Sequence, residues 1–318
     1  MPARLRLVSS QATQATWSLV LDDRARGASL LIDGRDRAEG CDRAGRQIRC
    51  ELRGMFPGGH TVELRLPGAI LRRSVVIGRS WPERPVLVRV RSIDDAKEAA
   101  EAGADAVVGD ESLGVEALQD IAEVVHAKSA RLFVDGRPEL VETAGADGVL
   151  GRAIPPELLR RFPEARTVAV DAAGTQLLAR LVESGPLGDS TQLQRTAGIV
   201  EAHGLLAGAL ALLAPRGAIV DRASFPLIGA RKRHAALRGG TGTFLTTEPT
   251  RVGFTLSKSG DDVTVLVNAH AEPWSVRPSA PSEPLDLLGS TINGGEVTVR
   301  PRDVALLVRA PAPDHTRY

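Results

Sequence analysis

Short apolar runs alternate with longer Ala- and Leu-rich stretches through the middle of the chain, and this alternation constrains the fold more than any other feature. The runs PVLVRV (85–90), ADAVVGD (104–110) and ARLFVD (130–135) have strand length, and a stretch with helical spacing follows each of them. Strands that alternate with helices form a parallel sheet with helical cover. We therefore expect a (β/α) region over residues 83–238.

The helices of this region have clear ends in some places and not in others. DDAKEAAEAG predicts a helix that begins at an Asp cap and ends at Gly103. Residues 191–214 predict one long helix that leads into GAIVD (217–221), and PLIGARKRHAALRGG predicts a basic helix with a solvated face. Residues 177–184 fit either a strand or a helix, because their apolar positions also share a helix face.

Four apolar runs end on an aspartate, and in (β/α) folds functional side chains gather where strands end. The residues in question are Asp110, Asp135, Asp171 and Asp221. An aspartate in this place can instead cap the next helix or satisfy a turn. We expect the four to share one rim, with both roles open.

The length of this region limits the barrel that it can build. From residue 85 to residue 222 there are 138 residues (222 − 85 + 1), whereas a full eight-unit barrel takes about 250. We therefore expect a reduced or incomplete (β/α) TIM-type barrel.

The two ends of the chain have a different texture. Residues 1–82 show short alternating runs between Gly, Pro and Asp, which is typical of a small antiparallel β-sandwich. Residues 239–318 contain the predicted hairpin RVGFTLSKSGDDVTVLVN, with SGDD at its turn, and several later strands. The expected fold class is multidomain α/β plus all-β: an N-terminal β-sandwich, the reduced barrel and a C-terminal antiparallel β-sandwich.

Composition excludes several classes of function. The formal net charge is +1 and aromatic residues make up 3% of the chain, which argues against nucleic acid as a partner. We find no apolar run of membrane-spanning length and no signal-peptide core, so we expect no membrane span and a cytoplasmic location by default.

The two cysteines, Cys41 and Cys50, flank a short turn sequence and are expected to face each other on a hairpin. They form either a disulfide, which would place the protein outside the cytoplasm, or two reduced core thiols. No histidine has another His or Cys at ligand spacing. We expect no metal and no cofactor.

The order of these three regions resembles the α-amylase family of glycoside hydrolases. The C-terminal match is the most specific: it comprises LIGARKRHAALRGGTGTF, VGFTLSKSGDDVTVLVNAHAEPWSV with its Val-Asn pair, LDLLG and VTVRPRDVALLV. Upstream, AAEAGADAVVGDES and DIAEVVHAKSARLFVDGRPE resemble the segments around the second and third barrel strands. The resemblance implies an immunoglobulin-like domain at residues 1–82, the reduced barrel at 83–238 and the family's C-terminal β domain at 239–318.

The chain departs from the family where the chemistry takes place. Members use an Asp nucleophile, a Glu acid/base and a second Asp, and retaining hydrolysis needs two carboxylates about 5–5.5 Å apart. In the fourth-strand motif Arg152 falls at the nucleophile, and a guanidinium cannot attack an anomeric carbon. The fifth-strand Glu falls near Val170 or Asp171, and the seventh-strand Asn-His-Asp matches SGP (184–186), which puts Pro186 at the last Asp.

We therefore expect a non-catalytic protein that binds an α-glucan or a protein partner, with a ligand rim formed by Asp110, Asp135, Arg152, Asp171 and Asp221. One alternative is a weakly active hydrolase or transferase that uses Asp135, Asp171 or Glu183, with Glu183 on a strand end. A second is a structural or assembly module. An exposed aromatic (Trp17, Trp81, Trp274 or Tyr318) would favour glucan binding, and an exposed apolar patch would favour assembly.

Overall fold

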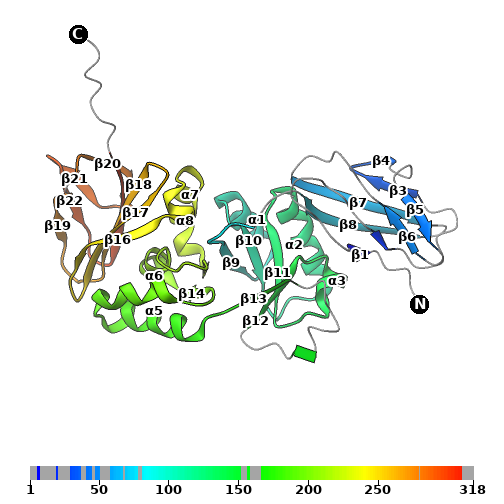
Figure 1. Cartoon of the computed structure of the whole chain (residues 1–318), viewed down its shortest axis with the longest axis horizontal. Coiled ribbons are helices and arrows are strands. Elements are labelled where there is room, and N and C mark those ends of the chain that lie inside the picture. The colour runs from blue at the N-terminus through cyan, green and yellow to red at the C-terminus, as the bar shows by residue number, and fades with distance from the viewer. Residues whose placement is uncertain are drawn as a thin grey trace, which may run out of the picture. The chain divides into compact units, whose positions relative to one another are not determined.

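Figure 1 shows the computed structural model, which describes residues 6–7, 19–20, 29–36, 41–44, 47–50, 58–66, 69–77, 81–151, 156–157, 166–278 and 280–309. The chain divides into two compact units. Unit 1 comprises Met1–Trp81 with Arg89–Ala169, and unit 2 comprises Pro82–Val88 with Val170–Tyr318. Because this division falls within the (β/α) region, the three expected domains with boundaries after residues 82 and 238 stay a prediction.

Unit 1 begins with antiparallel strands, drawn in blue in Figure 1. One sheet has the order β4-β3-β7-β8, where β3 is Ser29–Ile32, β4 is Arg35–Asp36, β7 is Gly58–Leu66 and β8 is Ala69–Ile77. Two further pairs join β1 (Arg6–Leu7) to β2 (Leu19–Val20) and β5 (Cys41–Ala44) to β6 (Gln47–Cys50). Leu30 and Ile32 are buried while Ser29 and Leu31 are only partly buried, as period-two alternation predicts.

The cysteine hairpin is confirmed at the level of the backbone. Cys41 and Cys50 are direct register partners in the antiparallel pair β5–β6, which is the placement that a cross-strand disulfide requires. Their side chains lie outside the described part of the chain, so the disulfide stays a prediction.

Seven parallel strands form a single sheet in the order β13-β12-β11-β10-β9-β15-β14. They are β9 (Val86–Val90), β10 (Ala106–Gly109), β11 (Arg131–Asp135), β12 (Gly148–Gly151), β13 (Arg166–Ala169), β14 (Val200–Ala202) and β15 (Ala218–Val220). Every residue of β10 and β12 is buried, as in parallel strands covered on both faces. The sheet confirms the reduced (β/α) barrel.

Three helices of unit 1 lie against its strands: α1 (Ile93–Ala102), α2 (Val115–Ala127) and α3 (Leu140–Ala144). Helix α1 ends at Gly103 as predicted, because φ there is +107° and glycine accepts that conformation without strain. Its start was predicted wrongly. The cap is Ser92, whose hydroxyl accepts from the Asp95 amide at 3.1 Å, and the acids Asp94 and Asp95 lie inside the first turn.

In unit 2 the single helix predicted over residues 191–214 is wrong. That segment contains the end of the 3-10 helix η2 (Leu187–Arg195), strand β14 and helix α6 (Gly204–Ala211). The chain turns sharply at Gly204, between β14 and helix α6. The φ of +82° at this residue is a conformation that glycine adopts without strain.

The ambiguous residues 177–184 are helical and belong to α5 (Ala172–Ser184). Leu178 and Leu181 are buried because they share the inner face of that helix. The segment between α5 and β14 therefore supplies a 3-10 helix and no strand, so the described residues form seven barrel strands in place of the usual eight.

The rest of unit 2 is mainly antiparallel. After η3 (Arg222–Ser224), α7 (Phe225–Arg233) and α8 (Ala236–Gly239), two sheets have the orders β16-β17-β18-β23-β20 and β19-β22-β21. The strands are β16 (Thr241–Thr247), β17 (Arg251–Lys258), β18 (Asp261–Asn268), β19 (Trp274–Val276), β20 (Ser282–Asp286), β21 (Thr291–Asn293), β22 (Glu296–Val299) and β23 (Asp303–Arg309).

Two local features fix this C-terminal region. The predicted hairpin turns at Ser259 and Gly260, which both have positive φ, as a two-residue turn of type I′ requires. Asn268, the Asn of the Val-Asn pair, is fully buried, and its amide donates to the carbonyls of Glu272, Val299 and Arg300. It thereby ties the end of β18 to the segment before β19 and to the end of β22.

Candidate functional site at the strand ends

In unit 1 the carboxyl end of β11 carries an ion pair. The Arg89 guanidinium on β9 donates to Oδ2 of Asp135, the last residue of β11. The two side chains are 27% and 19% exposed, so water screens the pair only in part. Asp135 is thus held by a strand of its own sheet that lies beyond β10.

Asp110 follows β10 and organises the loop that leads to α2. Its Oδ1 accepts from the amide of Ser112 at 3.0 Å and from its hydroxyl at 2.7 Å, and its Oδ2 lies 3.8 Å from Nε of Arg91. The hydrogen bonds from Ser112 lower the pKa of Asp110, and the charges of Arg91 and Arg89 act in the same direction. Arg137 donates to the Asp110 carbonyl at 3.2 Å and completes a rim of three arginines and two acids.

In unit 2 the strand-end acids hold backbone amides. Asp171 caps α5: Oδ1 accepts from the Gly174 amide and Oδ2 from the Ala197 amide, both at 2.8 Å. These backbone hydrogen bonds lower the pKa of Asp171. Asp221 accepts from the amides of Gly204 at 2.7 Å and of Ala223 at 3.1 Å.

The structure separates two of the alternative catalytic candidates, Asp171 and Glu183. Asp171 precedes the first residue of α5 and Glu183 is exposed near its end, twelve residues later. At 1.5 Å per residue they lie about 18 Å apart along the helix, far beyond the spacing of a carboxylate pair. Arg152 lies outside the described residues.

Pro186 does not occupy the end of a strand, contrary to the expected match of residues 184–186 with the seventh barrel strand. It separates α5 from η2 and is the residue before the first turn of η2. The strand next to β15 in the sheet is β14, so the residues at the seventh strand end are His203 and Gly204. The misplacement follows from the helix wrongly expected over 191–214.

Sequence reasoning also missed a buried carboxylate, Glu201, in the middle of β14. It is 5% exposed, and its amide donates to the Thr175 hydroxyl at 3.1 Å. A Cβ on Gly174 would come within 2.9 Å of Val200, so Val200 faces α5 and Glu201 faces the opposite side of the sheet. The run GIVEA (198–202) has strand length and contains this acid, and that pattern could have indicated a carboxylate within a strand.

An open groove of about 740 Å³ lies between α5 and η2 in unit 2. Asp171 forms part of its wall, together with Gln176, Leu177, Arg180, Gln192 and Arg195. The size falls in the range of small-molecule sites, and most of the residues that line the groove are polar. No aromatic ring borders it among the described residues.

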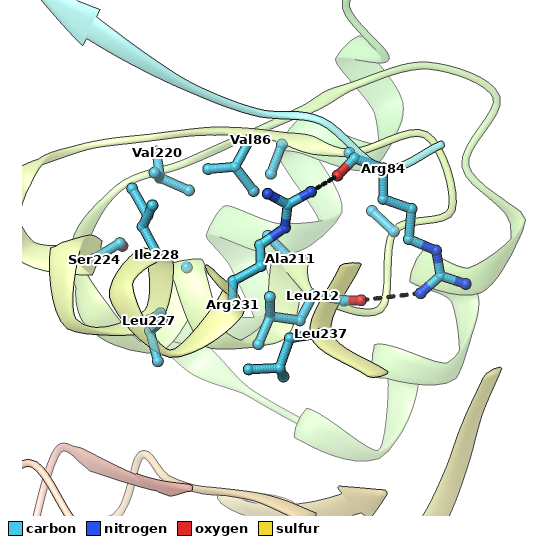
Figure 2. Close-up of a pocket in the computed structure, with 14 residues that line it drawn as sticks. Arg84, Val86, Ala211, Leu212, Val220, Ser224, Leu227, Ile228, Arg231 and Leu237 are labelled. Atoms are coloured by element: carbon cyan, nitrogen blue, oxygen red, sulfur yellow. Dashed lines mark hydrogen bonds between the residues drawn. The ribbon is translucent and has the colours of Figure 1, made fainter. Parts of the chain in front are cut away.

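A second, smaller cavity of about 20 Å³ lies among β9, β15, α6 and α7 (Figure 2). Most of its lining is aliphatic, and the volume suits one water molecule. Arg231 enters it from α7, is 3% exposed and donates to the Arg84 carbonyl. The predicted solvated face of this basic helix is therefore wrong at Arg231, and the helix is interrupted at His234.

The described tryptophans, Trp81 and Trp274, pack against other side chains. The Trp81 ring lies 5.3 Å from the Phe133 ring and 5.0 Å from the Arg131 guanidinium carbon. Trp274 is buried in the core of the C-terminal sheets. Trp17 and Tyr318 lie outside the described residues. No exposed aromatic platform is present on the part of the chain that the structure describes.

A Ser–His–Asp chain in unit 1 joins the β7–β8 hairpin to α2. Ser74 Oγ lies 2.8 Å from Nδ1 of His126, and Nε2 lies 2.8 Å from Oδ2 of Asp147. Burial alone would raise the pKa of Asp147, but His126 and the Leu132 amide hold it lower. His126 is 1% exposed, so a structural role fits it better than catalysis.

Other ligand classes find little support. Within the described ranges no group of three or more His, Cys, Asp or Glu side chains is placed to hold a metal ion. None of the described helices combines the length and apolar character needed to cross a membrane.

No protein-family model matches the sequence, and no curated protein matches it either. Solved structures do match. Eubacterium rectale Amy13B has a TM-score of 0.52 at 8% identity, over 73% of this chain and 96% of that chain. An AmyP variant in complex with maltotriose has a TM-score of 0.52 at 10% identity, over 72% of this chain and 98% of that chain. An α-amylase from Geobacillus thermoleovorans, complexed with acarbose, has a TM-score of 0.50 at 9% identity, over 74% of this chain and 100% of that chain.

These comparisons concern the fold. They identify the chain as a protein with the α-amylase fold, that is, a glycoside hydrolase-like (β/α) barrel with accompanying β sheets. The expected resemblance to that family is confirmed at this level.

Proposed function

We propose that this chain is a non-catalytic protein of the α-amylase fold that binds an α-glucan. One observation carries the first half of the proposal: Asp110, Asp135, Asp171 and Asp221 all have their carboxylates engaged in structural bonds. A glycosidase needs a free nucleophile and, close to it, a proton donor.

The electrostatics of these acids support the same conclusion. A general acid works best when its pKa is raised towards the working pH. Hydrogen bonds from Ser112 lower the pKa of Asp110, and backbone amides lower that of Asp171. Both carboxyls are therefore stabilised as anions and are poor proton donors at neutral pH.

The residue after the seventh strand adds to this argument. When β14 is matched with that strand, the family's Asn-His-Asp reads Ala202-His203-Gly204. Gly204 has no side chain, and its amide instead donates to Asp221. The third acid of the mechanism has no counterpart at this position.

The choice of α-glucan rests on the fold. Two of the structural neighbours were solved with acarbose or maltotriose, which makes these sugars the first ligands to test on this chain.

The test combines an activity assay with a binding assay on the full chain. We expect no reducing sugar from maltooligosaccharides, and we expect maltotriose at a hundredfold excess over its Kd to stabilise the fold by about 2.7 kcal/mol. Cellotriose serves as the matched control and should give no shift. Sugar release that disappears in Asp135→Asn or Asp171→Asn would show an enzyme, and thermal unfolding unchanged by every α-glucan would remove the proposed ligand.

A second candidate is binding of a protein partner. It is favoured by the packed state of Trp81 and Trp274, because an α-glucan usually stacks on an exposed ring. Ile70, Ile93 and Leu245 are the exposed large apolar side chains of the described residues, and they lie on three separate elements. Light scattering over a concentration series tests for self-association, the simplest form of this alternative.

A further inference from the structure

The groove between α5 and η2 has two walls that run in opposite directions. The Ala197 amide, just beyond η2, donates to Asp171, just before α5. At the other end only Gly185 and Pro186 separate the two helices. The two elements therefore form an antiparallel helical hairpin, and positions along one wall can be matched with positions along the other.

Each wall presents a glutamine and an arginine on one stripe. On α5, Ala173, Gln176, Leu177 and Arg180 follow the i, i+3, i+4, i+7 spacing of a single helix face, and all line the groove. On η2, Gln192 and Arg195 are three residues apart, so they stack directly in a 3-10 helix.

The antiparallel arrangement sets the order of these groups along the groove. Counted from Asp171, Gln176 lies about 7–8 Å and Arg180 about 13–14 Å along α5. Counted from Ala197, Arg195 lies about 4 Å and Gln192 about 10 Å along η2. The two carboxamides therefore occupy the middle of the groove, and a guanidinium lies towards each end.

These four side chains have unused bonding capacity. Gln176, Arg180, Gln192 and Arg195 are exposed, and none forms a side-chain hydrogen bond or ion pair with another described residue. The acid in the wall, Asp171, has both oxygens engaged by backbone amides. The groove thus offers two free cations and two free amides beside a carboxylate that is already satisfied.

We propose that this groove binds an anionic saccharide, whose hydroxyl groups bond to Gln176 and Gln192 and whose phosphate or carboxylate groups pair with Arg180 and Arg195. Guanidinium recognises both kinds of oxyanion through paired N–H donors. Carboxamides donate and accept at once, as hydroxyl groups require. The site and the ligand differ from those of the α-glucan proposal, which this inference does not need.

The experiment measures binding to the full chain by calorimetry. The probes are fructose 1,6-bisphosphate, glucose 6-phosphate, glucuronate, inorganic phosphate and glucose. We expect the bisphosphate to bind most tightly, since it can reach both arginines, and glucose to bind least. Each charge-assisted contact should lower the Kd about tenfold or more. Comparison of glucose 6-phosphate with glucuronate separates a phosphate from a carboxylate ligand.

Variants assign the binding to the groove. Arg180→Gln and Arg195→Gln should each weaken the bisphosphate about tenfold, and the double variant should remove binding. Arg216→Gln, which removes an exposed arginine outside the groove, is the matched control and should bind as the natural sequence does. All three arginines are exposed, so folding should survive each change, which circular dichroism checks.

Three results would overturn the inference. They are no binding of any anion, unchanged binding in the double variant, and inorganic phosphate bound as tightly as the sugar phosphates. None of them bears on maltotriose. A failure of this site is therefore distinguishable from a failure of the α-glucan proposal.

Discussion

In unit 1 the acids at the strand ends lie near arginine side chains, although Asp110 also accepts from the Ser112 amide, whereas in unit 2 each acid holds amides of two separate segments. Asp135 pairs with Arg89, and Asp110 lies near Arg91. Asp171 and Asp221 each accept from two amides that belong to separate segments. An ion pair between side chains can open to admit a ligand, but an amide held by a carboxylate belongs to the fold itself.

The difference also decides where free positive charge remains. In unit 1 Arg89 and Arg91 are occupied with acids of the rim. In unit 2 the backbone satisfies Asp171, and Arg180 and Arg195 remain open to a ligand in the groove beside it. Aspartates that look alike in the sequence thus leave the two units with different capacities to bind anions.

The largest expected effect tests the structural role of Asp171. Asp171→Ala removes the cap of α5 and leaves the Gly174 and Ala197 amides without their acceptor, so we expect a loss of about 2–3 kcal/mol in the free energy of unfolding. Urea denaturation measures it. Glu183→Ala, an exposed acid on the same helix, should stay within about 0.5 kcal/mol. Equal losses in the two variants would contradict the comparison.

A smaller effect is expected for the ion pair of unit 1. A double-mutant cycle of Arg89→Ala and Asp135→Ala should give a coupling of about 1 kcal/mol, because the pair is partly exposed. Raising the salt concentration should reduce this coupling, since it is electrostatic. A coupling of zero at low salt would mean that Asp135 is not held by Arg89, and the contrast between the two units would weaken.

Much of the fold follows from local sequence signals. The glycine that ends α1, the two-residue turn after Lys258 and the strand runs before Asp110 and Asp135 all depend on neighbours in the chain. Strand β14 does not: three residues in an Ala- and Leu-rich stretch become a strand because they pair with β15, and each residue has its partner eighteen residues further on. That non-local pairing explains why residues 191–214 were predicted as one helix.

The candidate site was harder to predict for a related reason. A carboxylate at a strand end serves equally well as a helix cap or as a reactive group, and only its three-dimensional partners distinguish the two roles. The same holds for Arg231, whose burial against the Arg84 carbonyl depends on packing between α7 and the chain before β9. The groove depends on the antiparallel placement of η2, an element that the sequence did not indicate.

The smallest expected effect concerns pH, and it tests why Asp171 is a cap. Backbone amides lower the pKa of this carboxyl in the folded state, so its contribution to stability is complete above its unfolded pKa of about 4 and is lost as the pH falls through the folded pKa. Protonated aspartic acid keeps one acceptor and gains a donor, as asparagine does. Asp171→Asn therefore mimics the acid form, and the stability difference between the two proteins should shrink as the pH falls from about 6 to about 3. Gln176→Ala, which removes no carboxylate, should keep the pH profile of the natural sequence. A difference that stays constant with pH would mean that the two amides do not depend on the charge of Asp171, and the backbone-held acid of unit 2 would then differ less from the arginine-paired acid of unit 1.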